Sequence, residues 1–157
     1  MTREEYFMQQ AIELSATGIE TNQGGPFGCV IVKGDEIVGR GNNQVTSTKD
    51  PTAHAEVVAI RDACKNLNTF QLCDCEIYTS CEPCPMCMGA IYWARPKKVY
   101  FANTRNDAAE IGFDDSMIYD ELVCEHAARK IPIIQLGRTE ALKVFESCRN
   151  KSDKMEY

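Results

Sequence analysis

Two short motifs hold the residues of this chain that are best suited to bind a metal. The first is H-A-E at residues 54–56, which contains one of only two histidines in the sequence. The second is P-C-P-M-C at residues 83–87, with cysteines three positions apart. Catalytic zinc sites use three protein ligands and leave one position for water. The motifs therefore predict one zinc ion per subunit, held by His54, Cys84 and Cys87.

A third cysteine makes the pairing ambiguous, because Cys81, Cys84 and Cys87 all fall three residues apart. Pro85 suits the first position of a helix, so Cys84 is expected at the N-cap and Cys87 in the first turn. The positive end of that helix favours thiolates. Cys81 precedes Pro83 and cannot share this geometry. A closed four-ligand structural site that includes Cys81, and a redox pair among the three cysteines, are open alternatives.

Glu56 stands two positions after His54 and can approach a water on the same metal. The order H-x-E…P-C-x-x-C is the signature of zinc nucleobase deaminases, in which the glutamate is not a ligand. Zinc lowers the pKa of its bound water towards ~7, and the resulting hydroxide can attack a ring carbon. Glu56 would take the water proton, deliver it to a ring nitrogen and then protonate the leaving amine. The alternative is an ordinary solvated helix residue.

Composition limits the partners of the protein. A chain of 157 residues fits one domain, which we place at 1–157, and its 44% hydrophobic and 25% charged residues are typical of soluble proteins. A net charge of -6 and the lack of a basic run disfavour a nucleic-acid partner. The apolar runs are far shorter than the ~20 residues of a membrane helix. Nine cysteines without a signal-peptide core indicate a reducing, cytoplasmic location.

The hydrophobic pattern predicts an α/β fold of three layers, α/β/α, with a mixed five-stranded sheet. Turn residues 33–35 join the first two strands as a hairpin. We expect helices at residues 3–18, 53–65, 84–93 and 139–148, the first of them stopping at Gly18. We expect strands at residues 29–32, 36–40, 75–80, 97–103 and 132–136.

Longer stretches of the sequence resemble a known enzyme family. PTAHAEVVAIRDAC, TSCEPCPMCMGAIYWARP and DAAEIGFDDSMIYDE are similar to the small bacterial guanine deaminases of the zinc-dependent cytidine deaminase superfamily. GGPFGCVIV, GRGNNQVT and the terminal KMEY extend the resemblance over nearly the whole chain. It implies a cytidine deaminase-like fold and zinc-dependent hydrolysis of guanine to xanthine and ammonia, a step of guanine catabolism in purine metabolism.

The resemblance also implies roles for individual residues. It makes His54, Cys84 and Cys87 the zinc ligands, leaves Cys81 out, and makes Glu56 the proton shuttle.

The resemblance also identifies residues that contact the purine substrate. Asn43 is similar to an amide that hydrogen-bonds the base, and Phe27 is similar to an aromatic residue that lines the base pocket. Ala55 is a further expected substrate-binding residue. Asp115 is similar to a carboxylate that reads the guanine edge and assists proton transfer, and Tyr157 to a tyrosine that reaches an active site. Physically, a buried carboxylate accepts the N–H donors of guanine and disfavours adenine. From the sequence alone, Asp115 could instead belong to a helix cap and Tyr157 to a frayed tail.

In that family the C-terminal segment, here about residues 138–157, crosses to a partner subunit. The resemblance therefore implies a domain-swapped homodimer in which each tail closes the other pocket. Guanosine deaminase is the nearest alternative activity. The acidic balance disfavours a tRNA adenosine deaminase, and His54 disfavours a cytidine deaminase, since those of this length commonly use cysteine there. A closed structural zinc module or a redox module without turnover is the alternative from another class.

Overall fold

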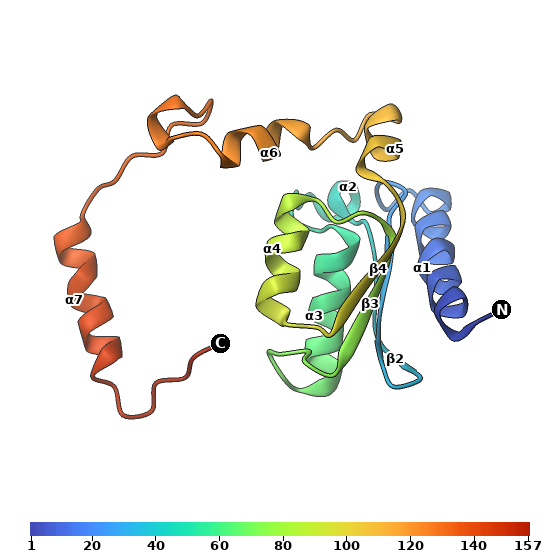
Figure 1. Cartoon of the computed structure of the whole chain (residues 1–157), viewed down its shortest axis with the longest axis horizontal. Helices are drawn as coiled ribbons and strands as arrows, with labels where there is room; N and C mark the ends of the chain where they lie inside the picture. Colours follow the sequence, from blue (N-terminus) through green and yellow to red (C-terminus); the bar gives the residue numbers. More distant parts are fainter. The chain divides into compact units, whose positions relative to one another are not determined.

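The computed structural model describes residues 1–157, which divide into two compact units. The first unit is Met1–Asp115 and the second is Ser116–Tyr157. The first unit contains the sheet, and the second consists of helices and connecting segments (Figure 1).

A mixed sheet of four strands forms the centre of the first unit, in the order β2-β1-β3-β4. Strand β1 pairs antiparallel with both β2 and β3, whereas β3 and β4 are parallel. The mixed sheet confirms the prediction, but the predicted number of five strands is wrong. The strands are β1 (Gly28–Lys33), β2 (Glu36–Asn42), β3 (Cys75–Cys81) and β4 (Lys98–Asn103).

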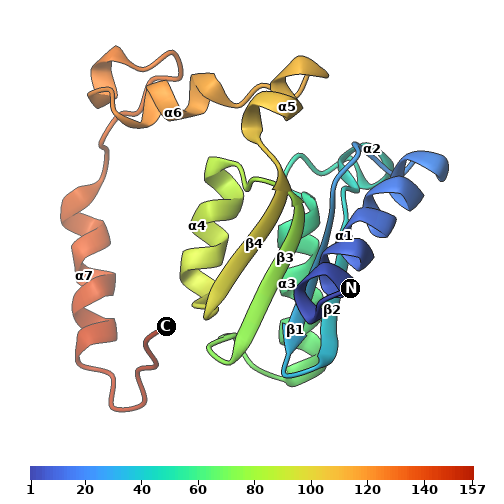
Figure 2. The ribbon, with the colours of Figure 1, turned by 45° about the vertical axis from the view of Figure 1, so that its right-hand side comes forward.

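Helices cover both faces of this sheet, which confirms the three-layer α/β/α prediction (Figure 2). Helix α1 (Arg3–Glu20) packs on one face, where Phe7 and Ala11 meet Val30 and Tyr78. Helices α3 (Ala55–Leu67) and α4 (Pro85–Ala94) pack on the other. Successive strand residues point to opposite faces. The continuous apolar run of β1 therefore supplies both cores at once.

The ends of α1 differ from the expected ones for a physical reason. Thr2 and Glu5 form a capping box that fixes the first turn. The helix continues past Gly18 to Glu20. A Cβ on Gly18 would lie 3.1 Å from the side-chain nitrogen of Asn42, so this glycine permits close packing on β2 and does not end the helix.

The expected strand at residues 132–136 is absent. This segment is exposed and has no regular secondary structure, and Leu136 is 94% exposed. Pro132 has no backbone N–H to donate to a ladder. A strand also needs the edge of a sheet to pair with. An apolar run predicts that a segment is buried, but it does not specify the strand with which the segment pairs.

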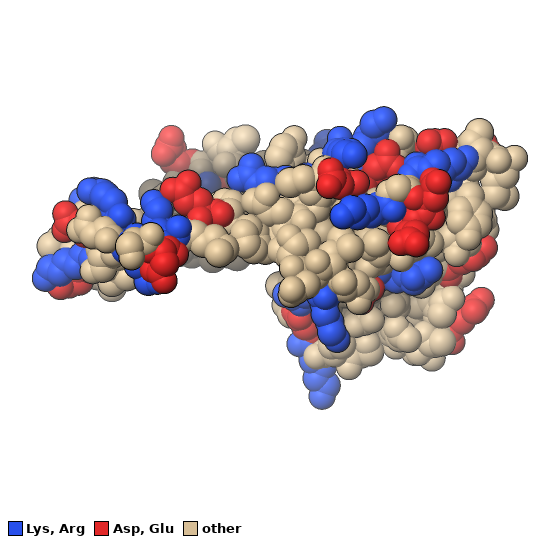
Figure 3. Space-filling model, turned by 90° about the horizontal axis from the view of Figure 1, so that it is seen from below, with Lys and Arg blue, Asp and Glu red and all other residues tan.

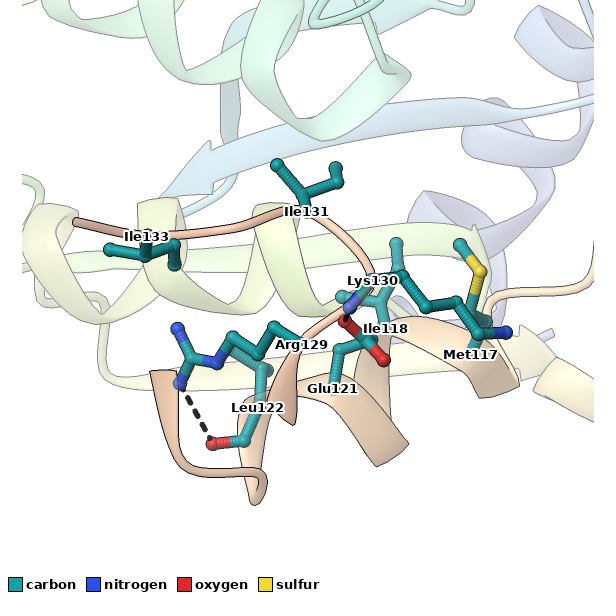
Figure 4. Close-up of a pocket in the computed structure, with 8 residues that line it drawn as sticks. All are labelled: Met117, Ile118, Glu121, Leu122, Arg129, Lys130, Ile131 and Ile133. Atoms are coloured by element: carbon teal, nitrogen blue, oxygen red, sulfur yellow. Dashed lines mark hydrogen bonds between the residues drawn. The ribbon is translucent and has the colours of Figure 1, made fainter. Parts of the chain in front are cut away.

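The second unit has no core of its own. It contains α6 (Ser116–Leu122), a 3-10 helix η1 (His126–Ala128) and α7 (Arg138–Arg149), which confirms the helix expected at 139–148. None of its residues is buried. An apolar pocket of 340 Å³ lies between α6 and the chain after η1 (Figure 4). The pocket is lined by Met117, Ile118, Glu121, Leu122, Arg129, Lys130, Ile131 and Ile133.

The surface carries charges of both signs. On the face shown in Figure 3, acidic and basic side chains are interspersed, and that face has no broad basic field. No helix in the structure combines the length and apolar character that crossing a bilayer requires.

Two short helices complete the first unit. Helix α2 (Val45–Thr48) follows β2, and helix α5 (Arg105–Glu110) follows β4. Each lies between a strand and a segment singled out in the sequence: the H-A-E motif follows α2, and I-G-F-D-D follows α5. Several candidate site residues therefore lie in the segments that follow strands of the sheet.

Candidate metal centre and active site

Two helix N-termini supply the candidate metal ligands. His54 is the N-cap of α3 and Cys84 is the N-cap of α4, both with extended backbones. Pro85 occupies the start of α4, as the sequence predicts, which puts Cys87 in its first turn. Neither N-cap side chain hydrogen-bonds its own helix. The imidazole and the thiol are thus directed to each other rather than used as caps.

The three donor atoms are spaced as a tetrahedral zinc site requires. His54 Nδ1 lies 3.5 Å from Cys84 Sγ and 3.5 Å from Cys87 Sγ. All three ligand atoms lie within 4.8 Å of one another. Zinc bonds of about 2.3 Å to sulfur and 2.0–2.1 Å to nitrogen put tetrahedral ligand atoms roughly 3.5–3.8 Å apart. The chemistry and spacing of this donor set therefore fit zinc.

The electrostatics of the site favour a thiolate at Cys84. Its pKa is lowered to about 4, chiefly by a hydrogen bond from the Cys87 thiol and next by one from His54. The bond to Cys84 also raises the pKa of His54. In the other hydrogen bond the Cys87 thiol donates its proton to Cys84, and this raises the pKa of Cys87. A metal bound to both sulfurs would displace that proton.

Glu56 lies beside these donors in a buried position. It is the second residue of α3 and is 6% exposed. Its Oε2 lies 3.3 Å from Cys87 Sγ, and its Oε1 lies 3.2 Å from the Thr79 hydroxyl oxygen. Burial raises the pKa of Glu56 above its usual value. A raised carboxyl pKa brings proton uptake and release closer to neutral pH, which suits a proton shuttle.

Cys81 is separated from the donor group. Its thiol donates to the backbone oxygen of Thr104 at 3.6 Å, and burial raises its pKa to about 11. The group of donor atoms close enough for one metal does not include it. All nine cysteines are free thiols. These contacts favour an open three-ligand site over a closed four-ligand one. The other histidine of the chain, His126, lies in η1 and is exposed.

A glycine-rich loop holds Asn43 in place. Asn43 is 6% exposed, and its Oδ1 accepts from the N–H groups of Gly25 at 3.2 Å and Val45 at 3.1 Å. A Cβ on Gly24 would lie 2.2 Å from that Oδ1, so only glycine lets the loop approach so closely. The side-chain oxygen is thus used internally, and the NH2 group is the part of this amide suited to a ligand.

Two aromatic rings pack together in the first unit. The ring of Phe27, in the G-G-P-F-G loop, meets Phe113 edge to face, with centroids 5.1 Å apart and an interplanar angle of 90°. Phe113 belongs to the I-G-F-D-D segment, so this segment contacts the loop that holds Asn43. The contact brings together two stretches that lie far apart in the sequence.

The other predicted site residues have different environments. Burial, and next the charge of Cys84, raise the pKa of Asp115, so this carboxylate lies within electrostatic reach of the donor group. Ala55 is fully buried in the core with α3. Tyr157 belongs to the second unit and is 69% exposed.

Comparison with known proteins identifies the family. Residues 1–103 match the family described as the cytidine and deoxycytidylate deaminase zinc-binding region. The chain belongs to this family. The matched region includes the H-A-E and P-C-x-x-C motifs of the candidate metal centre, and the sheet that carries them.

Individual members of the deaminase family cover different shares of the chain. The guanine deaminase of Bacillus subtilis (strain 168) is 55% identical over 153 residues, 98% of each chain. Its crystal structure matches with a TM-score of 0.95 over 98% of each chain. A structure of guanine deaminase from Nitrosomonas europaea matches at 33% identity and a TM-score of 0.66, over 69% of this chain and 63% of that one. The tRNA-specific adenosine deaminase of Aquifex aeolicus (strain VF5) is 44% identical over 62% of this chain and 64% of its own length.

Sequence reasoning missed two residues that contact the deaminase site. Phe113 packs on Phe27, and Thr79 hydrogen-bonds Glu56. A signal for Thr79 was present, since period-2 alternation puts it on the same face of β3 as the apolar Ile77. A polar side chain on a buried face needs a hydrogen-bond partner. No comparable signal in the sequence pointed to Phe113.

Proposed function

We propose that this chain is a zinc-dependent guanine deaminase that hydrolyses guanine to xanthine and ammonia. The observation that carries the proposal is the 55% identity to the Bacillus subtilis guanine deaminase over 98% of both chains. That similarity continues past residue 103, where the match to the shared zinc-binding region ends. It therefore covers the I-G-F-D-D segment, which the resemblance associates with recognition of guanine.

His54, Cys84 and Cys87 would hold one zinc ion per subunit. When bound, zinc lowers the pKa of a coordinated water and supplies a nucleophile at neutral pH. Glu56, two residues from the histidine ligand and 3.3 Å from a cysteine ligand, accepts a proton from the attacking water. It delivers that proton to the ring nitrogen. It then takes the second proton from the oxygen that has bonded to the ring carbon and gives it to the leaving amine, so it acts as general base and general acid in turn.

Four residues of the first unit would bind the purine. Asn43 offers its NH2 group to a ring acceptor, because its oxygen already accepts two backbone hydrogen bonds. Phe27 lines the base pocket, and Ala55 contributes its backbone at the start of α3. Asp115 accepts the N–H donors of the guanine edge and assists proton transfer. A substrate without those donors would leave a partly buried carboxylate unpaired, which is a source of specificity.

We also propose a homodimer in which residues 138–157 are swapped onto the partner. Residues 116–157 contain no buried residue. Large hydrophobic side chains are among the exposed ones: Leu136, Phe145 and Tyr157 are 94%, 71% and 69% exposed. A segment with so many exposed apolar side chains gains stability by covering a second surface. Tyr157 would then reach the partner's pocket and close it against water.

Deleting residues 154–157 tests the role of the tail. We expect kcat on guanine to fall about 10²-fold with zinc content unchanged, because an open pocket admits water and positions the base poorly. Light scattering should still give a dimer, twice the 17.6 kDa of one chain, because most of the swapped segment remains.

The single substitution Tyr157→Phe serves as the matched control for that deletion. It keeps the ring and should retain more turnover than the deletion does. Native turnover in the truncated protein would remove the tail from the account.

The nine free thiols of this chain fit a reducing compartment, so we propose a cytoplasmic location. In that setting the enzyme would act on free guanine in purine catabolism.

Ammonia release from a panel of substrates tests the activity. Zinc-loaded protein would be given guanine, guanosine, adenosine, cytidine and a tRNA anticodon stem in separate reactions. We expect release from guanine alone. Release from guanosine instead would assign the alternative nucleoside activity, and release from none of them would contradict a deaminase.

A further inference from the structure

We propose that Thr79 is a positioning residue that holds the carboxylate of Glu56 in its working orientation. The inference rests on the proposed deaminase function, and it assigns a role to a residue outside the zinc motifs.

Thr79 is a buried polar residue in the middle of the sheet. It lies in β3 between Cys29 of β1 and Phe101 of β4, and it is 1% exposed. The neighbouring Ser80, also buried, points to the opposite face, where its hydroxyl accepts from the N–H of Gly28 at 2.9 Å. Thr79 therefore brings a hydroxyl to the face of β3 that packs against α3, where Ile77 belongs to the apolar core.

The hydroxyl of Thr79 has two acceptors within reach. Its oxygen lies 3.2 Å from Glu56 Oε1 and 3.1 Å from the backbone oxygen of Cys81. A hydroxyl has one proton to donate. Hydrogen bonds to an ionised acceptor are stronger than those to a neutral one, and burial strengthens them further. The proton therefore goes to the Glu56 carboxylate when that group is charged.

The two oxygens of Glu56 consequently have separate tasks. Oε1 is tied to the sheet through Thr79, whereas Oε2 lies 3.3 Å from Cys87 Sγ, on the side of the metal ligands. A glutamate side chain has considerable rotamer freedom, and fixing it beforehand removes an entropic cost from the reaction. Thr79 thus holds one oxygen so that the other faces the reacting water.

Four substitutions separate the hydroxyl from the packing. Thr79→Val removes the hydroxyl and keeps most of the volume, Thr79→Ala removes both, and Thr79→Ser keeps the hydroxyl. Ile77→Val is the matched control, since it trims a buried apolar side chain on the same face of β3 that has no group able to hydrogen-bond Glu56.

Steady-state kinetics on guanine, zinc content and thermal midpoints would be measured for each variant. We expect kcat to fall about tenfold in both Val and Ala variants, with KM within about twofold and zinc content as in the native protein. The Ser variant should recover kcat to within about threefold. The control should lower the midpoint and leave kcat unchanged. Native kcat in Thr79→Val, or equal losses in Val and Ser variants, would overturn the proposal.

A double substitution tests whether Thr79 acts through Glu56. In a Glu56→Gln background, Thr79→Val should lower the residual rate by less than twofold, since the group that it positions no longer shuttles protons. A further tenfold loss there would show that Thr79 acts independently of Glu56. An inactive native protein would instead refute the deaminase function itself, so the two failures are distinguishable.

Discussion

Replacing Glu56 by glutamine is expected to lower kcat on guanine about 10³-fold while the protein keeps its zinc. Glutamine has nearly the shape of glutamate but cannot take up and release a proton at neutral pH. The side chain is 6% exposed, so bulk water cannot easily replace its proton transfer. The measurement is steady-state turnover together with zinc content and the thermal midpoint of unfolding.

The control for this substitution is a glutamine at an exposed glutamate far from the site. Glu13, on α1, is exposed, and α1 packs on the other face of the sheet, so Glu13→Gln should leave kcat and zinc unchanged. Turnover near the native level in Glu56→Gln, with zinc bound, would exclude Glu56 as the proton shuttle and leave the chemistry to another group.

Replacing Cys84 by alanine is expected to have an equally large effect through loss of the metal. Its sulfur lies 3.5 Å from His54 Nδ1 and has a pKa lowered to about 4, as suits a thiolate ligand. With two ligands left, zinc should dissociate during dialysis and turnover should fall at least about 10³-fold. Zinc content per chain and turnover would be measured together.

Cys81→Ala is the matched control, because Cys81 is a nearby buried cysteine of the same motif. Its thiol donates to the Thr104 backbone and has a pKa raised to about 11. We expect native zinc content and most of the turnover, with a loss of about 1 kcal/mol in the free energy of unfolding. Loss of zinc from Cys81→Ala would support a closed four-ligand structural site and contradict the open one.

The candidate metal centre could be predicted from the sequence because local rules determine its geometry. Pro85 fixes the start of α4, and a residue before a helix has an extended backbone, so the positions of Cys84 and Cys87 follow from the motif. His54 lies at a helix start for the same reason. Spacing alone left Cys81 as an alternative ligand, and the distances between donor atoms were needed to weigh it.

The fold was predictable where apolar periodicity and turn residues coincide. It was less predictable where a strand depends on pairing with a segment far away in the sequence. β1 and β2 were expected as a hairpin and form one. Residues 132–136 have the composition of a strand but form none, since composition does not supply a neighbouring edge. The contact of Phe113 with Phe27 was likewise beyond prediction, because it depends on long-range packing between a loop and the chain after α5.

Zinc titration of metal-free protein, followed by conversion of guanine to xanthine, tests the central claim most directly. We expect no conversion without metal, and a rate that rises in proportion to added zinc up to one equivalent per chain. Conversion by the metal-free protein, or full zinc binding without any xanthine formed, would contradict a zinc-dependent guanine deaminase.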